Sequence, residues 1–295
     1  MIVDEKPKIG LVTVLYNGDE ALPDFFSSLA KQSYKNFILY VIDNSPETTT
    51  IGIAKELSEI YNIPSLFIRN DNNLGVAAGN NIGISLSLRD KCKYTLLLNN
   101  DIDFGYDVLE RMVSFLKNHD EDIVVPKIYY AGTKKIWMAG GDISLFKGST
   151  THRGDMEDDI GRYNDIRYVG YAPTCFMIIK NTVFDKTGMM DEKYFVYYDD
   201  TDFIFRAKTF GYKICYFPCV SINHKVSLST GGAESPFSIY YGNRNRFYFI
   251  KKNLRGVCKY ISLSFFMFTR LIRWFQFNKV QKNSLLKAIK DMWTM

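Results

Sequence analysis

The chain has 295 residues, of which 46% are hydrophobic and 15% aromatic, so it can bury a full core and is not a disordered protein. Its length suits one large α/β domain with an appendage, or two domains. The net charge of +5 is unevenly spread, because residues 251–295 carry ten Lys or Arg and one acid, Asp291, whereas the first 250 residues are net acidic.

The N-terminal residues and the cysteines give no sign of secretion. Residues 1–6 contain no apolar run, so no signal peptide is expected. The cysteines form no CxxC pair, and we interpret them as reduced, mostly buried thiols of a cytosolic protein. They are Cys92, Cys175, Cys215, Cys219 and Cys258.

Strand-like and helix-like segments alternate through the first 128 residues, with short connections between them. Strands are predicted at residues 8–15, 37–42, 65–68, 94–98 and 123–128, and helices at about 19–32, 47–61, 74–88 and 106–118, with Asp19 capping the first helix. This order is typical of a mostly parallel central sheet with helices on both faces.

The strand at 94–98 is an apolar run of the kind that is buried on both faces of a sheet. Polar residues follow it at once: Asn99, Asn100, Asp101 and Asp103. Ligands of open α/β sheets bind past the carboxyl ends of the strands, where Asp43 and Asn73 should also converge. Two carboxylates two residues apart suit a hard divalent cation. A simple turn is the alternative, since Asn and Asp favour turns.

Three glycines at a spacing of four open the helix at 74–88, namely Gly75, Gly79 and Gly83. They would let a backbone approach phosphates at the helix start, or let the helix pack closely on the sheet. The sequence has no GxxxxGK[ST] motif and no GxGxxG motif after its first strand, so neither a P-loop nor a dinucleotide site is expected.

Beyond residue 128 the alternation dissolves, and residues 130–168 are expected to form a long loop of the kind that is often functional. A helix is then predicted at 201–210 and a strand at 212–217, and His224 is placed in a loop over 223–232. Five acids crowd among aromatic residues just before the helix: Asp191, Glu192, Asp199, Asp200 and Asp202.

Asp200 is the strongest candidate for a catalytic carboxylate among these acids. Asp199 is placed to cap the helix at 201–210. Asp202 lies about 200° round the helix from Asp200, where Arg206 is its natural i,i+4 partner. Asp200 is then free to face a cleft, and capping and surface roles for all three acids are the alternative.

The order of the motifs is more specific than any one of them. They are VTVLYN at 12–17, VIDNS at 41–45, NLGVAAGNN at 73–81, LNND at 98–101, FVYYDDTD at 195–202, FR at 205–206, His224, and YYGNRNR at 240–246. In this order they resemble the inverting family 2 glycosyltransferases with a GT-A fold, most closely their rhamnosyltransferase-like branch. The resemblance covers about residues 8–252.

The resemblance implies an α/β nucleotide-diphospho-sugar transferase domain over 1–253 and a C-terminal amphipathic basic helical extension over 254–295. Asp200 falls on the family's catalytic base, Asp101 on the metal-binding aspartate of its DxD motif, and His224 on a residue that meets the metal or the diphosphate. A divalent cation, Mn²⁺ or Mg²⁺, is the implied cofactor. The donor nucleotide would be bound by Thr13, Tyr16, Asn17, Asp43, Asn73, Gly75, Gly79, Asn80 and Asn100.

One position departs from the family pattern. The DxD motif aligns with residues 99–101, so its first aspartate is replaced by Asn99, which offers a carbonyl oxygen but no charge. Asp103 offers a second DxD in another register. The second metal ligand is therefore left open between Asn99 and Asp103.

In the extension, apolar residues recur at helical spacing, namely Ile261, Phe265, Phe268, Ile272 and Phe275. Arg270 and Arg273 lie off this stripe and argue against a membrane-spanning helix. An amphipathic helix on an anionic membrane surface and a helix packed on the domain or on a second subunit are both open. The basic excess favours the membrane, and nucleic acid is not an expected partner.

The function expected from the resemblance is transfer of a sugar from a dTDP-rhamnose or UDP-hexose type of donor to a hydroxyl of a glycan or lipid-linked acceptor. The enzyme would be cytoplasmic, peripherally associated with the inner face of the cell membrane, and active in bacterial surface polysaccharide synthesis. The alternatives are an aspartate-dependent phosphohydrolase using Asp101 and Asp103, and an inactive nucleotide-sugar-binding module. A homo-oligomer is left open.

Overall fold

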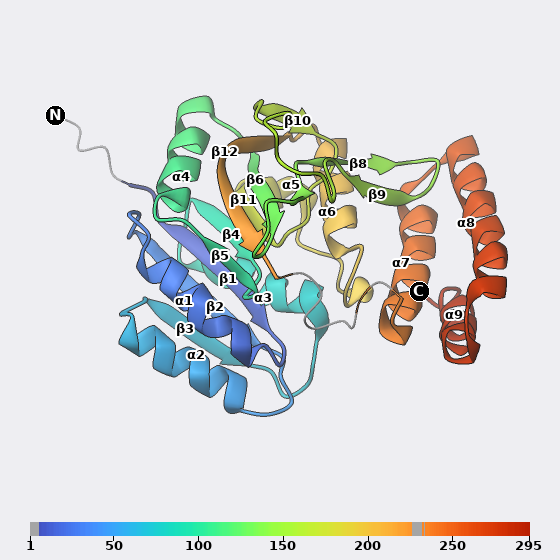
Figure 1. Ribbon diagram of the computed structural model, residues 1–295, viewed down its shortest axis with the longest axis horizontal. Coiled ribbons are helices and arrows are strands. Elements are labelled where there is room, and N and C mark those ends of the chain that lie inside the picture. The colour runs from blue at the N-terminus through green and yellow to red at the C-terminus, as the bar shows by residue number, and fades with distance from the viewer. Residues whose placement is uncertain (1–5, 226–231, 233) are drawn as a thin grey trace.

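The computed structural model describes residues 6–225, 232 and 234–295 (Figure 1). Its strands are β1 Ile9–Leu15, β2 Phe37–Asp43, β3 Ser65–Arg69, β4 Tyr94–Leu98, β5 Ile102–Phe104, β6 Ile123–Tyr130, β7 Ile136–Met138, β8 Gly141–Ser144, β9 Ser149–His152, β10 Arg167–Val169, β11 Phe176–Lys180 and β12 Ile214–His224. Its α-helices are α1 Leu22–Ala30, α2 Thr49–Ile60, α3 Gly75–Arg89, α4 Val108–His119, α5 Val183–Thr187, α6 Asp199–Thr209, α7 Pro236–Asn253, α8 Gly256–Gln276 and α9 Lys279–Asp291.

The central sheet has the order β10-β12-β6-β11-β4-β1-β2-β3, with β5 on β12 and β7 on β6. Strands β3, β2, β1 and β4 are parallel, as the alternation of strands and helices predicted, and β6 is parallel to β12. Strand β11 is inserted antiparallel between β4 and β6. The chain enters β11 from an irregular segment rather than from a crossover helix, so nothing requires it to be parallel.

Helix α3 packs closely on β1 through its small residues. A Cβ at Gly79 would lie 2.8 Å from Val14 Cγ1, and a Cβ at Gly83 would lie 2.2 Å from Val12 Cγ1. Both distances are shorter than real carbon contacts, so these two glycines serve the packing of helix on sheet. This decides between the two readings of the glycine spacing for Gly79 and Gly83.

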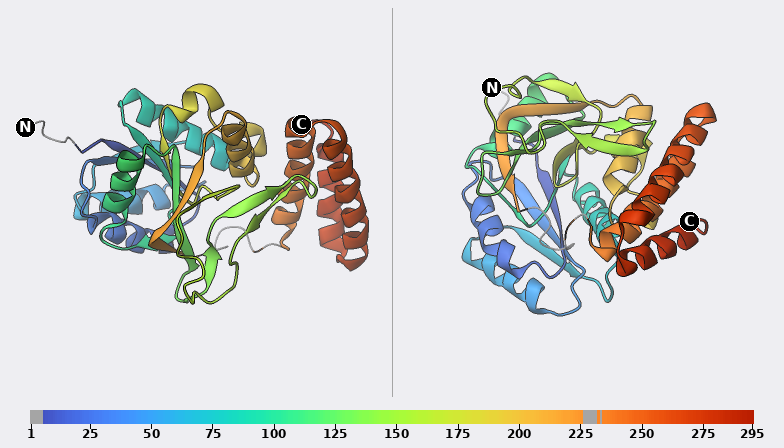
Figure 2. Two further views of the ribbon diagram at one scale, coloured as in Figure 1. Left: turned by 90° about the horizontal axis from the view of Figure 1, so that it is seen from above. Right: turned by 45° about the vertical axis from the view of Figure 1, so that its right-hand side comes forward.

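The predicted long loop over 130–168 is wrong in part, because it contains four short strands. Strands β8 and β9 form an antiparallel hairpin that reaches from the sheet across to α7 and α8 (Figure 2). At its tip the ring of Phe146 lies 4.8 Å from that of Phe265. Strands of three or four residues are too short to show an alternating pattern of apolar residues, so sequence periodicity could not find them.

The predicted cap of the first helix is also wrong. A short 3-10 turn at Asp19–Ala21 precedes α1, and no side chain caps either element. The carboxylate of Asp19 instead accepts a hydrogen bond from the hydroxyl of Thr50, which belongs to α2.

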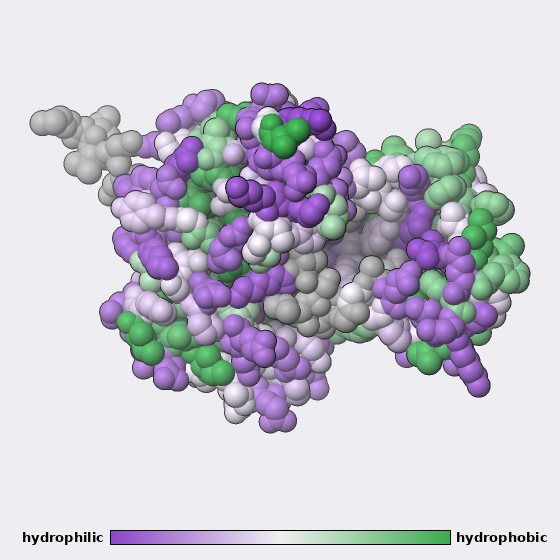
Figure 3. Space-filling view, viewed as in Figure 1, coloured by the Kyte–Doolittle hydropathy of each residue, from purple (hydrophilic) through white to green (hydrophobic). Residues whose placement is uncertain are grey.

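The C-terminal helices pack on the domain through their inner faces. Phe266 of α8 and Met292 share a buried cluster with Phe247 of α7, and Leu285 of α9 packs near Ile239. The outer face of α8 stays exposed, with Val257, Tyr260, Phe268, Leu271 and Phe275 each more than half accessible. In Figure 3 apolar residues gather at this end of the molecule. Among the described residues, no helix combines the length and apolar character needed to cross a bilayer.

Candidate active site

A cavity of about 1000 Å³ lies at the carboxyl ends of β1, β2 and β4. The sheet contributes the segment after β4, the hairpin contributes β9, and α6 and α7 contribute their N-terminal turns. Of the residues predicted to form the site, those that line the cavity are Tyr16, Asn73, Gly75, Asn80, Asn100, Asp101, Asp200 and His224. These predicted residues therefore share one cavity.

One wall of the cavity is formed by Asp101 and His224. His224 is the last residue of β12, not part of a loop, and its Nε2 lies 3.2 Å from Asp101 Oδ1. The rest of the predicted loop, 226–231, lies outside the described residues. Asp101 Oδ1 and His224 Nδ1 are both buried without a hydrogen-bond partner in the described part of the chain. An anionic oxygen and an imidazole left in this state suit a cation ligand set.

Asn99 lies at this wall of the cavity, whereas Asp103 does not. Asn99 Nδ2 lies 3.4 Å from His224 Nε2, so its amide lies beside the same ring. Asp103 lies within β5, where it accepts a hydrogen bond of 2.7 Å from Asn223 Nδ2, and it lines a separate pocket. Residues two apart on one strand would share a face, but Asp101 lies in a bend before β5, and this bend separates the two carboxylates. The structure does not bring the two predicted carboxylates together.

Among the residues expected around the nucleotide, four do not line the cavity: Thr13, Asn17, Asp43 and Gly79. Thr13 Oγ1 and Asp43 Oδ2 are buried atoms with no hydrogen-bond partner among the described residues. Asp43 Oδ1 accepts from Ser45 N–H, and the Asn17 N–H donates to the Ser45 hydroxyl. Gly79 packs against the sheet and does not line the cavity.

The N-terminus of α3 is less open to phosphates than its glycines suggested. The Gly75 N–H donates to Asn73 Oδ1, and the Val76 N–H donates to the carbonyl of Phe195. Gly75 has φ +84°, and a Cβ there would lie 2.4 Å from the Phe195 carbonyl oxygen. This glycine is needed because the backbone of the 195–198 segment approaches it so closely.

The acids at the start of α6 point in two directions. Asp202 is fully buried and pairs with Arg206 Nε at 2.7 Å, which confirms the predicted i,i+4 pair. It also accepts from Tyr194 and Lys252. Asp200 faces the cavity, as the helical geometry required. The predicted cap at Asp199 is wrong, because α6 begins at this residue and no side chain caps it.

Asp200 has both of its carboxylate oxygens engaged at fixed positions. Oδ1 accepts from the Thr201 N–H and hydroxyl, and Oδ2 accepts from the Tyr171 hydroxyl at 2.6 Å. Burial raises the pKa of Asp200, and these hydrogen bonds oppose the rise. Burial, followed by the charge of Asp200, raises the pKa of Asp199 to about 8. At neutral pH Asp199 therefore holds its proton.

Three residues of this wall were not found from the sequence. Tyr171 is buried on the strand side of the cavity, and burial raises the pKa of its phenol well above its usual range, so it donates and never ionises. His152 of β9 stacks on the Tyr171 ring at 5.9 Å, and the Trp137 ring lies edge-on against His224 at 4.6 Å. These residues come from the segment predicted to be a loop or follow it directly, so no local pattern marked them.

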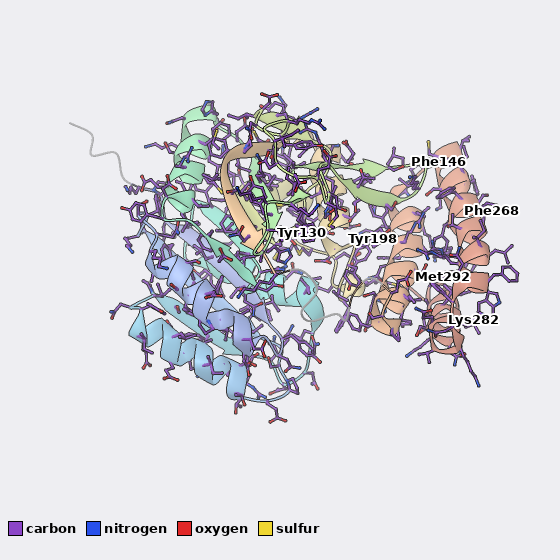
Figure 4. The ribbon with its side chains drawn as sticks, in the orientation of Figure 1. Tyr130, Phe146, Tyr198, Phe268, Lys282 and Met292 are labelled. Carbon is purple, nitrogen blue, oxygen red and sulfur yellow. The ribbon has the colours of Figure 1, made fainter. Side chains whose placement is uncertain are left out.

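An aromatic segment directly before α6 has a strained backbone. Phe195, Tyr197 and Tyr198 have φ between 62° and 69°, which is uncommon for side chains of this size. Asn245 of α7 is fully buried and donates from Nδ2 to the carbonyls of residues 194, 196 and 197 at 2.7 to 3.0 Å. The segment supplies an aromatic wall to the cavity, and Figure 4 shows Tyr198 between α6 and α7.

Comparison with known proteins gives a consistent family. The sequence profile of glycosyl transferase family 2 matches residues 11–188. The low-salt glycan biosynthesis hexosyltransferase Agl10 of Haloferax volcanii is 24% identical over 242 residues, which covers 81% of this chain and 74% of that protein. The dTDP-rhamnosyl transferase RfbF of Shigella flexneri is 23% identical over 257 residues, which covers 82% and 79%.

Solved structures show the same fold. The crystal structure of S. aureus TarS 1-349 in complex with UDP has a TM-score of 0.60 at 17% identity, over 97% of this chain and 80% of that one. The chain spans 47% of the longer TarS structure. The crystal structure of GalNAc-T7 with UDP, GalNAc and Mn²⁺ has a TM-score of 0.63 at 14% identity, over 92% and 56%. These likenesses confirm the GT-A architecture.

Proposed function

Because this chain belongs to glycosyl transferase family 2, we propose that it transfers a sugar from a nucleotide-diphospho-sugar to a hydroxyl of a saccharide acceptor in one inverting displacement. The observation that carries this proposal is the arrangement of Asp200 in the same cavity as Asp101 and His224. One carboxylate is set apart as a base, and Asp101 and His224, 3.2 Å apart, line the cavity from another wall.

Asp200 would accept the proton of the acceptor hydroxyl while the new bond from that oxygen to the sugar carbon forms and the nucleoside diphosphate leaves. Its hydrogen bonds to Tyr171 and Thr201 hold the carboxylate in one orientation and leave lone pairs for the acceptor. A single displacement requires no covalent nucleophile. It inverts the configuration at the sugar carbon.

Asp101 and His224 would hold a divalent cation, Mn²⁺ or Mg²⁺, because Asp101 Oδ1 has no hydrogen-bond partner among the described residues and His224 Nε2 lies 3.2 Å from it. Within residues 6–225, 232 and 234–295 no set of three or more His, Cys, Asp or Glu residues is arranged to hold a metal. Two protein ligands then leave room for donor phosphate oxygens and water. When bound, the cation would offset the charge of the leaving diphosphate.

The donor and the acceptor are proposed from similarity. A dTDP-rhamnose or UDP-hexose type of donor is supported by the names of RfbF and Agl10 and by UDP in the related structures. A glycan or lipid-linked saccharide is the proposed acceptor, in bacterial surface polysaccharide synthesis. The phosphohydrolase alternative needs Asp101 and Asp103 in one site, and they line different pockets.

We also propose that the enzyme works in the cytoplasm, attached peripherally to the inner face of the cell membrane through α8. Its exposed apolar face continues for five helical turns from Val257 to Phe275, and residues 251–295 carry ten Lys or Arg against one acid. Replacing Phe268 and Phe275 together with Glu should abolish sedimentation with phosphatidylglycerol vesicles, while Phe210→Glu on the distant α6 end should not. Conversion of a wild-type dimer to a monomer by the same change would identify the face as a subunit interface instead.

The transferase proposal is tested by incubating the protein with nucleotide sugars in the presence of Mn²⁺ and an excess of acceptor extract. Release of nucleoside diphosphate together with a sugar-bearing product supports it. Release of inorganic phosphate would indicate a phosphohydrolase, and saturable binding without turnover would indicate an inactive binding module.

A further inference from the structure

Two arginines at the junction of α7, α8 and the β8–β9 hairpin have no acidic partner. Arg246 donates from Nε and Nη2 to the carbonyl of Lys147 at the hairpin tip. Arg270 donates from Nη1 to Asn243 Oδ1 at 2.6 Å, and its Nε is buried without any hydrogen-bond partner among the described residues. No described carboxylate lies within ion-pair distance of either guanidinium, and the undescribed residues 226–231 and 233 contain no acid.

Both guanidinium groups lie against the same aromatic ring. The central carbon of Arg246 is 5.4 Å from the centroid of Phe266, and that of Arg270 is 5.6 Å from the same centroid. Burial lowers the pKa of Arg246, and burial with the charge of Arg246 lowers the pKa of Arg270 to about 10. Two partly desolvated cations that repel one another are stabilised by an anion placed between them.

This junction lies one helical turn of α7 beyond the residues that line the active-site cavity. Ser238 and Gly242 line the cavity from α7, and Arg246 lies one turn further on the same face of that helix. Tyr198 lines the cavity next to Asp199 and Asp200, its hydroxyl donates to the Gly148 carbonyl of the hairpin, and its phenol interacts electrostatically with both arginines. An anionic group extending from an acceptor bound at Asp200 along α7 would reach the arginines.

We infer that Arg246 and Arg270 form an anion-binding site that takes a phosphate or diphosphate group of the acceptor, so that the acceptor is a phosphate-bearing saccharide. The inference deepens the proposed transferase function and rests on it. Planar guanidinium groups bind phosphate oxygens with two parallel hydrogen bonds. The donor diphosphate is assigned to the opposite side, at Asp101 and His224, so the two anionic groups are kept apart. Acidic headgroups of membrane lipids share the same chemistry and are the competing source.

The test uses inorganic pyrophosphate as the probe, with EDTA present so that cation-dependent binding is absent. Calorimetry should detect a complex with the wild-type chain that weakens as salt is raised. Arg246→Gln and Arg270→Gln should each weaken it about tenfold to a hundredfold, the loss expected for one charge-assisted hydrogen bond. Arg273→Gln is the matched control, because Arg273 lies on α8 but pairs with Glu234 at 3.2 Å. A variant is used only if its melting temperature equals that of the wild-type chain.

In the pyrophosphate experiment, three results would overturn the inference. They are the absence of pyrophosphate binding in the wild-type chain, unchanged binding in the double variant, and equal weakening in Arg273→Gln. If Arg246→Gln fails to fold, Arg270→Gln carries the test, since Arg246, unlike Arg270, donates hydrogen bonds to the hairpin tip.

Phosphatidylglycerol vesicles separate the two sources of phosphate. Retained sedimentation of Arg270→Gln with vesicles supports the acceptor assignment. Parallel loss of vesicle and pyrophosphate binding would overturn it in favour of lipid headgroups. Nucleoside diphosphate release from the donor alone should be unchanged in Arg270→Gln. If the wild-type chain releases no nucleoside diphosphate, that result counts against the transferase function itself.

Discussion

Replacing Tyr171 with Phe removes one hydrogen bond from the proposed base and leaves the packing nearly unchanged. The Tyr171 hydroxyl donates to Asp200 Oδ2 at 2.6 Å inside a buried wall, and the ring stacks on His152, which Phe can also do. A hydrogen bond to a charged group is worth about 1.5–3 kcal/mol. That energy favours the ionised form of Asp200, so its loss raises the pKa of the base.

The sign of the effect follows from the role of the base, which must be ionised to accept a proton. The acid limb of the pH profile of kcat/KM should move to higher pH in Tyr171→Phe. Below that limb the rate should fall about tenfold to a hundredfold, because each 1.36 kcal/mol changes the ionised fraction tenfold, and it should recover at higher pH. The other groups facing Asp200 are Asp199, His152 and Thr201, and they are unchanged.

The assay is steady-state transfer measured from pH 5 to pH 9 under saturating donor. Tyr168→Phe is the control, since Tyr168 is half exposed and donates to Glu121 far from the cavity. An acid limb that stays in place in Tyr171→Phe, or a loss of rate that is equal at every pH, would refute the role given to this hydrogen bond.

Three further predictions concern the neighbouring carboxylates. Asp101→Ala should abolish metal-stimulated donor binding in calorimetry, while Asp103→Ala should have little effect; wild-type affinity for donor with Mn²⁺ in Asp101→Ala would remove this residue from the cation site. Asp199 binds its proton more tightly in the folded state, with a pKa of about 8 against a usual 3.8, so its contribution to stability is lost as the pH rises from about 4 to 8. The melting temperature of Asp199→Asn should therefore exceed that of the wild type by an amount that grows over this window and then levels off, and a pH-independent difference would contradict it. Asp202→Asn should lower the free energy of unfolding by about 3 kcal/mol, because it removes the charge of a fully buried carboxylate that pairs with Arg206 and Lys252; an unchanged melting temperature would show that these pairs are dispensable.

Local rules predicted the parts of the site that depend on local geometry. The strand at 94–98 was found at its observed bounds, because an uninterrupted apolar run has few alternatives. The opposite orientations of Asp200 and Asp202 follow from helical periodicity alone, and both were predicted correctly. Local rules could not predict that β5 would turn Asp103 away from the cavity, because the three-residue strand exists only through its pairing with β12.

The remainder of the site depends on long-range pairing. Strand β12 continues past the irregularity between Phe217 and Ser221 to His224, but Pro218 interrupts its apolar pattern, so the sequence favoured an early end. Tyr171 reaches Asp200 because its backbone bridges Gly141 at the start of the β8–β9 hairpin. A single tyrosine in an apolar segment carries no sign of such a role.

The basic extension has one face packed on the domain and one face exposed, so it combines the two arrangements that the sequence left open. Its inner residues Phe266 and Leu285 pack against α7, which is the protein contact that the sequence left open. Its outer residues remain exposed, which is the face that the membrane proposal requires. The apolar stripe alone could not separate these faces, because α8 carries apolar side chains around most of its circumference.

The most direct measurement is the turnover of Asp200→Asn with the donor and acceptor that the wild-type enzyme uses, under saturating donor and with donor affinity determined in parallel. Asparagine keeps the shape of the side chain but cannot serve as a base of the same strength. Donor affinity and melting temperature should stay close to wild type, while kcat falls about 10²- to 10⁴-fold, the usual contribution of a positioned general base. Near wild-type transfer by Asp200→Asn would contradict the assignment of Asp200 and the inverting mechanism built on it.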